Sequence, residues 1–322
     1  MALHALQSAP LLDDSFPMPV TSPFTPQAAR REGIPRSWLT QLVRSGHLRR
    51  VVKGVYVAAQ VPDSTHLRVQ SLALVVPPDA IVCDRHAAWL HGAPMVLAPN
   101  EHLELQPIRM FRPAGHERLR STLADSGQRA FSAGDVVDVE GLRVTSALRT
   151  AWDLGRVRQR EHALSGLDAM LRLGVFPRDE LLDGVERFRG ERWITHLREL
   201  APLADGRSES PGESVCRLRW IDMGLEPPDL QIEIREVGVV VVRLDLGRKA
   251  VRFAVEYDGE EWHSSAEQVE HDRVRRTWMA EHHGYLVAPV RAKNVYGPER
   301  DIERIIDDGL VAARARSGRR AA

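Results

Sequence analysis

Two apolar segments that carry acidic residues at fixed places most constrain how this chain folds. Residues 239–246 read VVVVRLDL, residues 251–258 read VRFAVEYD, and a short turn at 247–249 lies between them. Side chains alternate between the two faces of a strand. Asp245 and Glu256 both fall on the less apolar face, so a hairpin would bring the two carboxylates together on neighbouring strands of one sheet.

Neighbouring carboxylates repel each other unless a cation lies between them. Their oxygens suit Mg²⁺ or Mn²⁺, which keep several waters and bridge to phosphate groups. Such an ion lowers the pKa of a bound water and neutralises charge that develops on phosphorus. The pair therefore predicts a divalent-metal site that cleaves a phosphodiester. The alternative is that these acidic residues are simply solvated at the strand ends.

The flanking segments predict further elements around this hairpin. Residues 210–213 read SPGE, a capping box that starts a helix, so Glu213 either caps that helix or points at the metal site. We expect a strand at 230–234, a helix that Gly284 ends, a strand at 285–290 and a helix at 298–316. The predicted order is helix, three strands, helix, strand, helix.

This C-terminal segment, from about 208 to 295, resembles the DUF559 family, relatives of the very-short-patch-repair endonucleases in the PD-(D/E)xK nuclease superfamily. The resemblance rests on SPGES at 210–214, Asp245, VEYDG at 255–259, Trp262-His263, and Asp272-Arg273 with Arg276. It implies that Asp245 is the main metal ligand, that Glu256 is the second acidic ligand, and that Glu213 is the carboxylate carried by the helix.

One position departs from the superfamily pattern. A lysine is expected two residues after the second acid, and this chain has Asp258 there, which leaves the general base open. His263 is a catalytic candidate because imidazole titrates near neutral pH, although it equally suits a structural role. Arg273 and Arg276 share a helix face and either clamp phosphate or pair with nearby acidic residues.

The N-terminal region has the pattern of a winged helix-turn-helix. Residues 25–33 and 35–46 predict two short helices, and residues 48–57 predict two strands around a Lys-Gly turn. From 25 to 60 there are seven basic residues and one acidic residue, Glu32. Such an excess favours a polyanion, because each neutralised phosphate releases condensed counterions. The alternative is a small basic protein-interaction domain.

In a winged helix the second helix enters the major groove and the strands contact the backbone. The predicted DNA-binding residues are Arg36, Ser37, Gln41 and Arg44 on that helix, Arg49, Arg50 and Lys53 on the strands, and Arg273 and Arg276 beside the metal site.

Residues 33–57, GIPRSWLTQLVRSGHLRRVVKGVYV, resemble the N-terminal winged helix of AbiEi-type antitoxins from type IV toxin–antitoxin systems. The resemblance continues at 80–92 and at 141–154. It implies that this module binds operator DNA, and that the following region acts on a toxin or adds DNA contacts.

The predicted fold class is a multi-domain α/β protein. We expect a leader at 1–24 that is loose or packs back on a domain, a winged helix-turn-helix at 25–62, and a mixed α+β AbiEi-like region at 63–204. A DUF559 nuclease-like domain with a restriction-endonuclease-like α-β-β-β-α-β core would follow at 205–322, after a linker at 204–209. The two cysteines lie far apart and form no disulfide framework or zinc site. This fits a cytoplasmic protein, and no segment has the pattern of a membrane span.

Three functions follow from these patterns. The first is a metal-dependent DNA endonuclease or nickase that a winged helix directs to DNA. The second is an antitoxin-type transcriptional regulator whose nuclease fold is inactive. The third is an interaction protein that neutralises a cognate toxin. The retained acidic set argues against decay of the site, because unpaired carboxylates in a partly buried cluster are costly. Double-strand cleavage would favour two sites and therefore a homodimer.

Overall fold

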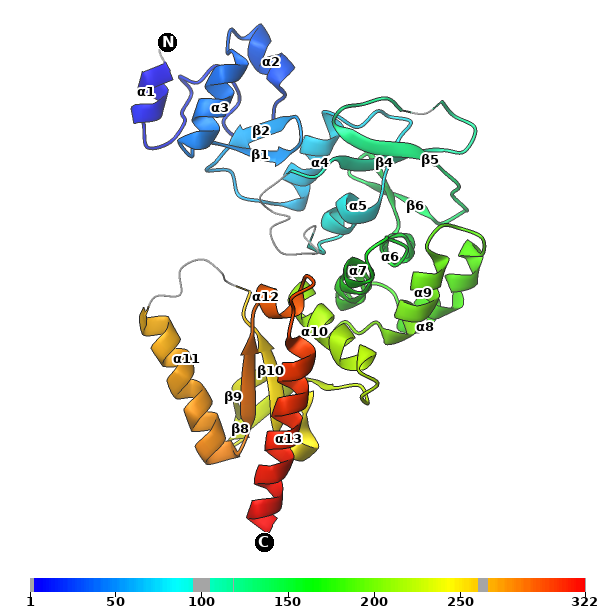
Figure 1. Ribbon diagram of the computed structural model, residues 1–322. Coiled ribbons are helices and arrows are strands. Elements are labelled where there is room, and N and C mark those ends of the chain that lie inside the picture. The colour runs from blue at the N-terminus through cyan, green and yellow to red at the C-terminus, as the bar shows by residue number, and fades with distance from the viewer. Residues whose placement is uncertain (1–2, 95–104, 118, 260–265, 322) are drawn as a thin grey trace. The chain divides into compact units, whose positions relative to one another are not determined.

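A computed structural model describes residues 3–94, 105–117, 119–259 and 266–321. The chain forms two compact units, which divide between Asp153 and Leu154. Both units contain helices and strands, and the strands of the described residues form three sheets (Figure 1). The predicted multi-domain α/β class is therefore confirmed at this level.

The first unit begins with the elements predicted from its basic region. They are α2 (Pro26–Arg31), α3 (Arg36–Arg44), β1 (Leu48–Val52) and β2 (Val55–Ala58). The Thr25 side chain caps α2 by accepting a hydrogen bond from the Ala28 N–H. β1 and β2 are antiparallel, and Gly54 at their turn has a φ of 87°, which glycine adopts readily. Their role as a DNA-binding winged helix stays a prediction.

The leader packs back on these elements rather than hanging loose. It contains α1 (Leu3–Ser8), and its apolar side chains Leu6, Leu12 and Phe16 join a buried cluster with Leu39 of α3. The Gln60 side chain also donates a hydrogen bond to the Leu12 carbonyl at 2.6 Å. The segment 1–24 is therefore part of the N-terminal fold.

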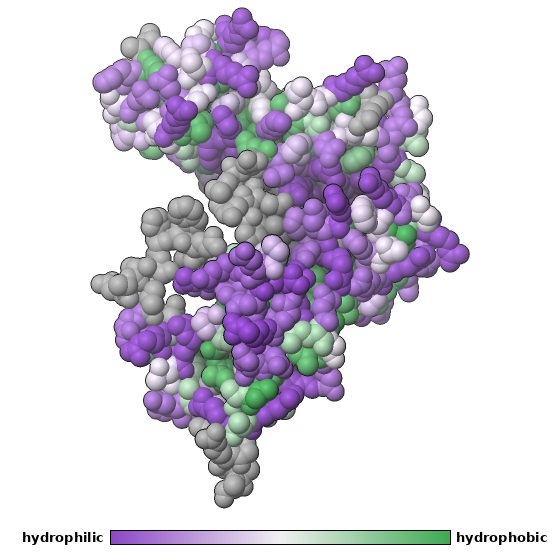
Figure 2. Space-filling model, viewed as in Figure 1, coloured by the Kyte–Doolittle hydropathy of each residue, from purple (hydrophilic) through white to green (hydrophobic). Residues whose placement is uncertain are grey.

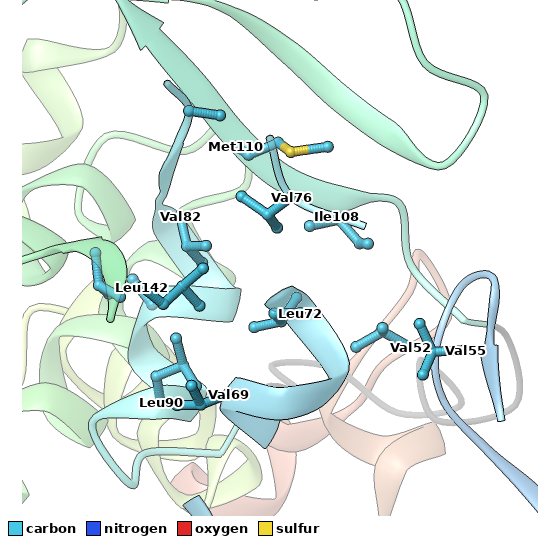
Figure 3. Close-up of a cluster of buried hydrophobic side chains, with 13 residues drawn as sticks. Val52, Val55, Val69, Leu72, Val76, Val82, Leu90, Ile108, Met110 and Leu142 are labelled. Carbon is cyan, nitrogen blue, oxygen red and sulfur yellow. The ribbon is translucent and has the colours of Figure 1, made fainter. Parts of the chain in front are cut away.

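The rest of the first unit is a five-stranded sheet with the order β5-β4-β3-β7-β6. Its elements are α4 (Thr65–Ala73), β3 (Ile81–Val82), α5 (Asp84–Leu90), β4 (Ile108–Pro113), β5 (Ala124–Arg129), β6 (Val136–Val139) and β7 (Leu142–Thr145). Val69 and Leu72 of α4 belong to one buried cluster with the sheet residues Val82, Ile108 and Met110 (Figure 3). Burial of these side chains fixes α4 on the sheet.

A group of helices opens the second unit. It follows α6 (Ala147–Leu154), which ends at the division between the units, and comprises α7 (Arg160–Arg172), α8 (Arg178–Asp183), a 3-10 turn at Val185–Phe188, α9 (Ile194–Leu200) and a 3-10 turn at Ala201–Leu203. Buried apolar residues of α7 and α9, such as Leu167 and Leu197, form the interior of this group.

The segment expected as a linker, 204–209, is partly packed against its neighbours. Asp168 of α7 binds Arg217 through two hydrogen bonds of 2.6 and 2.8 Å, and both side chains are buried. The same carboxylate accepts the N–H of Asp205, and Arg217 also donates to the Leu203 carbonyl. Since a buried ion pair with satisfied hydrogen bonds requires fixed geometry, the segment joins α7 firmly to the next helix.

The C-terminal sheet has the strand order β11-β10-β9-β8, in which β10 and β11 are parallel and the other pairs antiparallel. Its elements are α10 (Pro211–Asp222), β8 (Asp229–Glu236), β9 (Val239–Arg248), β10 (Phe253–Tyr257), α11 (Ala266–Trp278), a π-helical turn at Met279–His283, β11 (Leu286–Val290), α12 (Ala292–Val295) and α13 (Ile302–Ala321). The expected order of elements is present, with α12 added. The turn after β9 lies at 249–252 rather than at the expected 247–249, because β9 continues through Arg248.

Helices cover both faces of this sheet (Figure 1). On one face, Phe253 and Val255 pack with Ile306 of α13, and on the other Ala254 packs with Met279 at the end of α11. Gly309 allows α13 to approach closely, since a Cβ there would lie 2.1 Å from the Phe253 ring. None of the described helices is long and apolar enough for a bilayer. Hydrophilic residues dominate the face in Figure 2.

Candidate metal and DNA-contact sites

The strand register places the two predicted metal ligands side by side. Leu246 of β9 pairs with Val255 of β10, so Asp245 and Glu256 follow at the next position of the two strands. The Asp245 carboxylate accepts the backbone N–H of Tyr257 at 2.7 Å, which fixes its orientation at the end of the ladder. The sequence prediction of adjacent carboxylates on one sheet is consistent with this geometry.

The surroundings of Asp245 disfavour its charged form. Burial, together with the negative charges of Glu256 and Glu209, raises the pKa of Asp245 to about 6, although the Tyr257 N–H and Arg275 oppose the shift. A carboxyl whose pKa is raised by burial and by a second carboxylate would gain from a bound cation, which reverses both effects.

Glu256 has a partner that sequence reasoning missed. The Arg275 guanidinium of α11 contacts its carboxylate at 2.6 Å, and the Glu256 side chain is 13% exposed. Arg275 lies between the predicted phosphate contacts Arg273 and Arg276, and only the packing of α11 on the sheet decides which of these three arginines points inward. Arg273 instead pairs with Glu270 on the same helix, at 2.6 and 2.8 Å.

Ser210 caps α10, and the Glu213 carboxylate binds groups beside that cap. The Ser210 hydroxyl accepts the Glu213 N–H, and the Glu213 carboxylate accepts the N–H of Glu209 and the side chain of Gln231, each at 2.9 Å. Burial raises the pKa of Glu213, and the charge of Asp245 adds to that rise. Glu213 therefore lies close enough to Asp245 to sense its charge, while its carboxylate holds α10 to β8.

The start of α10 packs tightly on the same region of the sheet. A Cβ on Gly212 would lie 2.1 Å from the Tyr257 ring. The glycine of the SPGES motif thus allows the helix to approach the strand end that carries Asp245 and Glu256.

Of the remaining predicted residues near the site, one forms an ion pair and two lie outside the part of the chain that the structure describes. Asp258 contacts the Arg291 guanidinium at 3.2 Å, so an ion pair occupies the position of the superfamily lysine. His263 and the side chain of Asp272 lie outside the described residues. Among the described residues, no group of three or more His, Cys, Asp or Glu side chains is placed to hold a metal ion. Two carboxylates with waters and a phosphate still match the way proteins hold Mg²⁺.

The predicted DNA-contact helix presents its polar side to solvent. In α3, Leu39 and Leu42 are buried, and the predicted base-contacting residues are exposed, namely Arg36, Ser37, Gln41 and Arg44. On the hairpin, Arg49 donates to the Val61 carbonyl at 2.9 Å, and Arg50 lies 5.6 Å from the centre of the Tyr56 ring. Lys53 is half-buried.

A buried chain of alternating charges crosses the first unit, and sequence reasoning gave its members no role. Asp84 contacts Arg109 and Arg129, and Arg129 also contacts Asp153. The chain continues through Arg149 to Asp135 at 2.6 Å. The sequence did carry a signal for this chain of charges, because the antitoxin-like segments 80–92 and 141–154 supply Asp84, Arg149 and Asp153.

Comparisons with known proteins place this region in a family. Residues 80–203 match the AbiEi antitoxin C-terminal domain. The chain is 35% identical over 263 residues to two proteins of Mycobacterium tuberculosis, "Uncharacterized protein MT2308" of strain CDC 1551 / Oshkosh and "Uncharacterized protein Rv2248" of strain ATCC 25618 / H37Rv. In both cases the match covers 81% of this chain and 91% of the relative. The AbiEi-like middle region is thereby confirmed over 80–203, while the winged-helix and DUF559 resemblances stay predictions. The chain belongs to the family of these two mycobacterial proteins, and its residues 80–203 match the AbiEi antitoxin C-terminal domain.

Proposed function

We propose that the chain is a DNA-binding protein of the antitoxin type, with α3 as the helix that contacts DNA. The observation that carries this proposal is the exposed side of α3, where Arg36 and Arg44 are free of the apolar contacts that hold Leu39 and Leu42. The antitoxin-domain match over 80–203 supports the same role. In this proposal the AbiEi-like region holds a cognate toxin or adds DNA contacts.

Binding to duplex DNA at several salt concentrations tests the role of α3. The probes are a fragment with the promoter region of the chain's own gene and a random duplex of equal length. We expect the Arg36→Ala, Arg44→Ala double variant to bind at least tenfold more weakly, since each base or phosphate contact contributes about 1–3 kcal/mol. If these residues contact phosphate, the salt dependence should also become shallower.

The matched control is Arg143→Ala, which removes an exposed arginine from β7 of the same unit. It should leave DNA binding unchanged. Equal affinities for the wild type and the double variant would refute the role of α3, and a preference for neither probe would argue against operator recognition.

A second candidate function, hydrolysis of phosphodiesters with Mg²⁺ or Mn²⁺, is favoured by the raised pKa of Asp245 beside Glu256. These two carboxylates would hold the ion, which supplies an activated water and neutralises charge on the phosphate. The Tyr257 N–H orients Asp245, and Arg275 neutralises Glu256 until a cation or a phosphate competes for it. Glu213 would act mainly by positioning α10, and no described residue is assigned as general base.

Incubation of supercoiled and linear DNA with Mg²⁺, Mn²⁺ or EDTA tests this activity, and thermal melting with Mn²⁺ tests ion binding directly. Wild-type protein should cut DNA with the metals alone and melt at a higher temperature with Mn²⁺. Asp245→Asn should lose both effects, whereas Asp308→Asn, an exposed site on α13, should keep both. A wild type that neither cuts nor responds to Mn²⁺ leaves the DNA-binding role alone.

A further inference from the structure

The outer half of the β8–β9 hairpin extends beyond the rest of its sheet. β10 pairs with β9 only at residues 246–248, whereas β8 pairs with β9 out to Glu236 and Val239. β8 is the edge strand, and in the described part of the chain nothing pairs with its outer side (Figure 1). Such an edge presents unpaired N–H and C=O groups that can template another strand.

The tip of this hairpin is apolar although it lies in solvent. Val237 is fully exposed, Val239 is 65% exposed, and Val240 and Val241 are 40% and 42% exposed. The register shifts by one residue after Ile234, so Val241 is an extra residue in β9, and Val239 and Val240 fall on opposite faces of the ribbon. Both faces of the ribbon therefore expose valine.

Local folding does not explain these valines. Val237 and Gly238 form the two-residue turn with φ values of 48° and 83°. Turns of this kind favour Asn-Gly, and a β-branched residue in the left-handed region is strained by about 1–3 kcal/mol. An exposed, strained valine suits a surface that another molecule covers.

We propose that a second copy of this chain pairs with this hairpin, through antiparallel pairing of the open edges of the two β8 strands around a two-fold axis at Ile234. Glu233 and Arg235 stand on the outward face of β8, 46% and 55% exposed. In antiparallel pairing centred on Ile234, Glu233 of each copy lies opposite Arg235 of the other. Opposite charges at directly facing positions stabilise a strand pair and like charges destabilise it. The edge is thus complementary to itself, as a two-fold interface requires.

The placement of Glu233 and Arg235 also suits pairing between two copies. Within one chain, Arg235 already binds Glu233 at 2.5 and 3.0 Å, so the two side chains are correctly placed on one face of the strand. The resulting dimer holds a continuous sheet of eight strands, and it does not depend on metal binding or on DNA cleavage.

Charge exchange on the full-length protein tests the interface. Molar mass by light scattering and sedimentation should give a dimer for the wild type at micromolar concentration. Glu233→Arg and Arg235→Glu should each raise the dimer dissociation constant about tenfold or more, since each places two like-charge pairs across the axis. The double exchange Glu233→Arg, Arg235→Glu restores facing opposite charges and should restore the dimer.

The control is Glu186→Arg, which breaks an exposed ion pair with Arg198 elsewhere in the same unit and should leave the dimer intact. Circular dichroism establishes that each variant is folded. A monomeric wild type at high micromolar concentration overturns the proposal, and so does a dimer that both single exchanges leave unchanged. Recovery in the double exchange excludes a general loss of solubility as the cause.

Discussion

Two buried carboxylates, one in each unit, have opposite electrostatic surroundings. In the first unit, Asp84 is buried between Arg109 and Arg129, and despite its burial these guanidinium groups lower its pKa to about 2. In the second, burial and the charge of Glu256 raise the pKa of Asp245 to about 6. Asp84 has more positive than negative contacts, whereas Asp245 faces a second acid and receives one backbone N–H.

This difference separates two uses of buried charge. An alternating chain of ion pairs with satisfied hydrogen bonds holds a fold in one arrangement, and removing one member is costly. Buried carboxylates that too few positive charges or hydrogen-bond donors neutralise lower the stability of the free protein. A bound cation restores that stability. This difference fits a structural role for the Asp84 network and favours the proposed ion-binding role for the Asp245 region. Four measurements test the difference between the two carboxylates.

The largest effect is expected for Arg129→Met. The change leaves Asp84 and Asp153 without the guanidinium that joins them, and breaking a buried ion pair in this way costs about 3–5 kcal/mol. Denaturant unfolding measures the free energy of unfolding. Arg198→Met, which breaks an exposed pair with Glu186, should cost under about 1 kcal/mol. Equal losses would show that the network contributes no more than a surface pair.

A smaller loss, of about 2–3 kcal/mol at pH 7, is expected for Asp84→Asn. Because the pKa of Asp84 is lower in the folded protein, its charge contributes stability above pH 4, and this contribution declines as pH falls from about 4 towards 2. The free energies of unfolding of wild type and variant should therefore approach each other below pH 4. A difference independent of pH would assign the loss to packing.

The opposite sign is expected for Asp245→Asn, which should stabilise the protein by about 1–2 kcal/mol at pH 7. The folded pKa of Asp245 is raised, so its charge destabilises the folded state increasingly from about pH 4 to about pH 6. The amide oxygen can still accept the Tyr257 N–H. Unfolding at pH 4 should show no gain, and a loss of stability at pH 7 would contradict the assignment of Asp245 to an undercompensated site.

The smallest effect concerns the partial compensation by Arg275. Since its positive charge lowers the pKa of Asp245, Arg275→Gln should raise that pKa. Carboxyl titration followed by nuclear magnetic resonance measures the change. Arg273→Gln, which removes an arginine bound to Glu270, should leave the pKa of Asp245 where it is. If the pKa of Asp245 changed in Arg273→Gln but not in Arg275→Gln, α11 would pack on the sheet through a different face.

The sequence anticipated much of the candidate site, and its failures are specific. Strand alternation placed Asp245 and Glu256 on adjacent strands, and the SPGE motif predicted the helix that Ser210 caps. Neither pattern could show that Arg275 neutralises Glu256, because α11 carries three arginines and the packed face is set by the sheet. The leader and the segment 204–209 looked irregular, yet their few apolar and polar anchors fix them on neighbouring helices.

Periodicity, caps and glycines along the chain determined the order of elements at both ends, because these signals act within a few residues of one another. The sequence also determined that acidic residues would meet on the C-terminal sheet, since a hairpin with alternating side chains allows little else. Tertiary structure alone decided how each buried charge is compensated. That outcome depends on residues far apart in the chain, such as Asp84 with Arg129 and Glu256 with Arg275, whose meeting is fixed by packing.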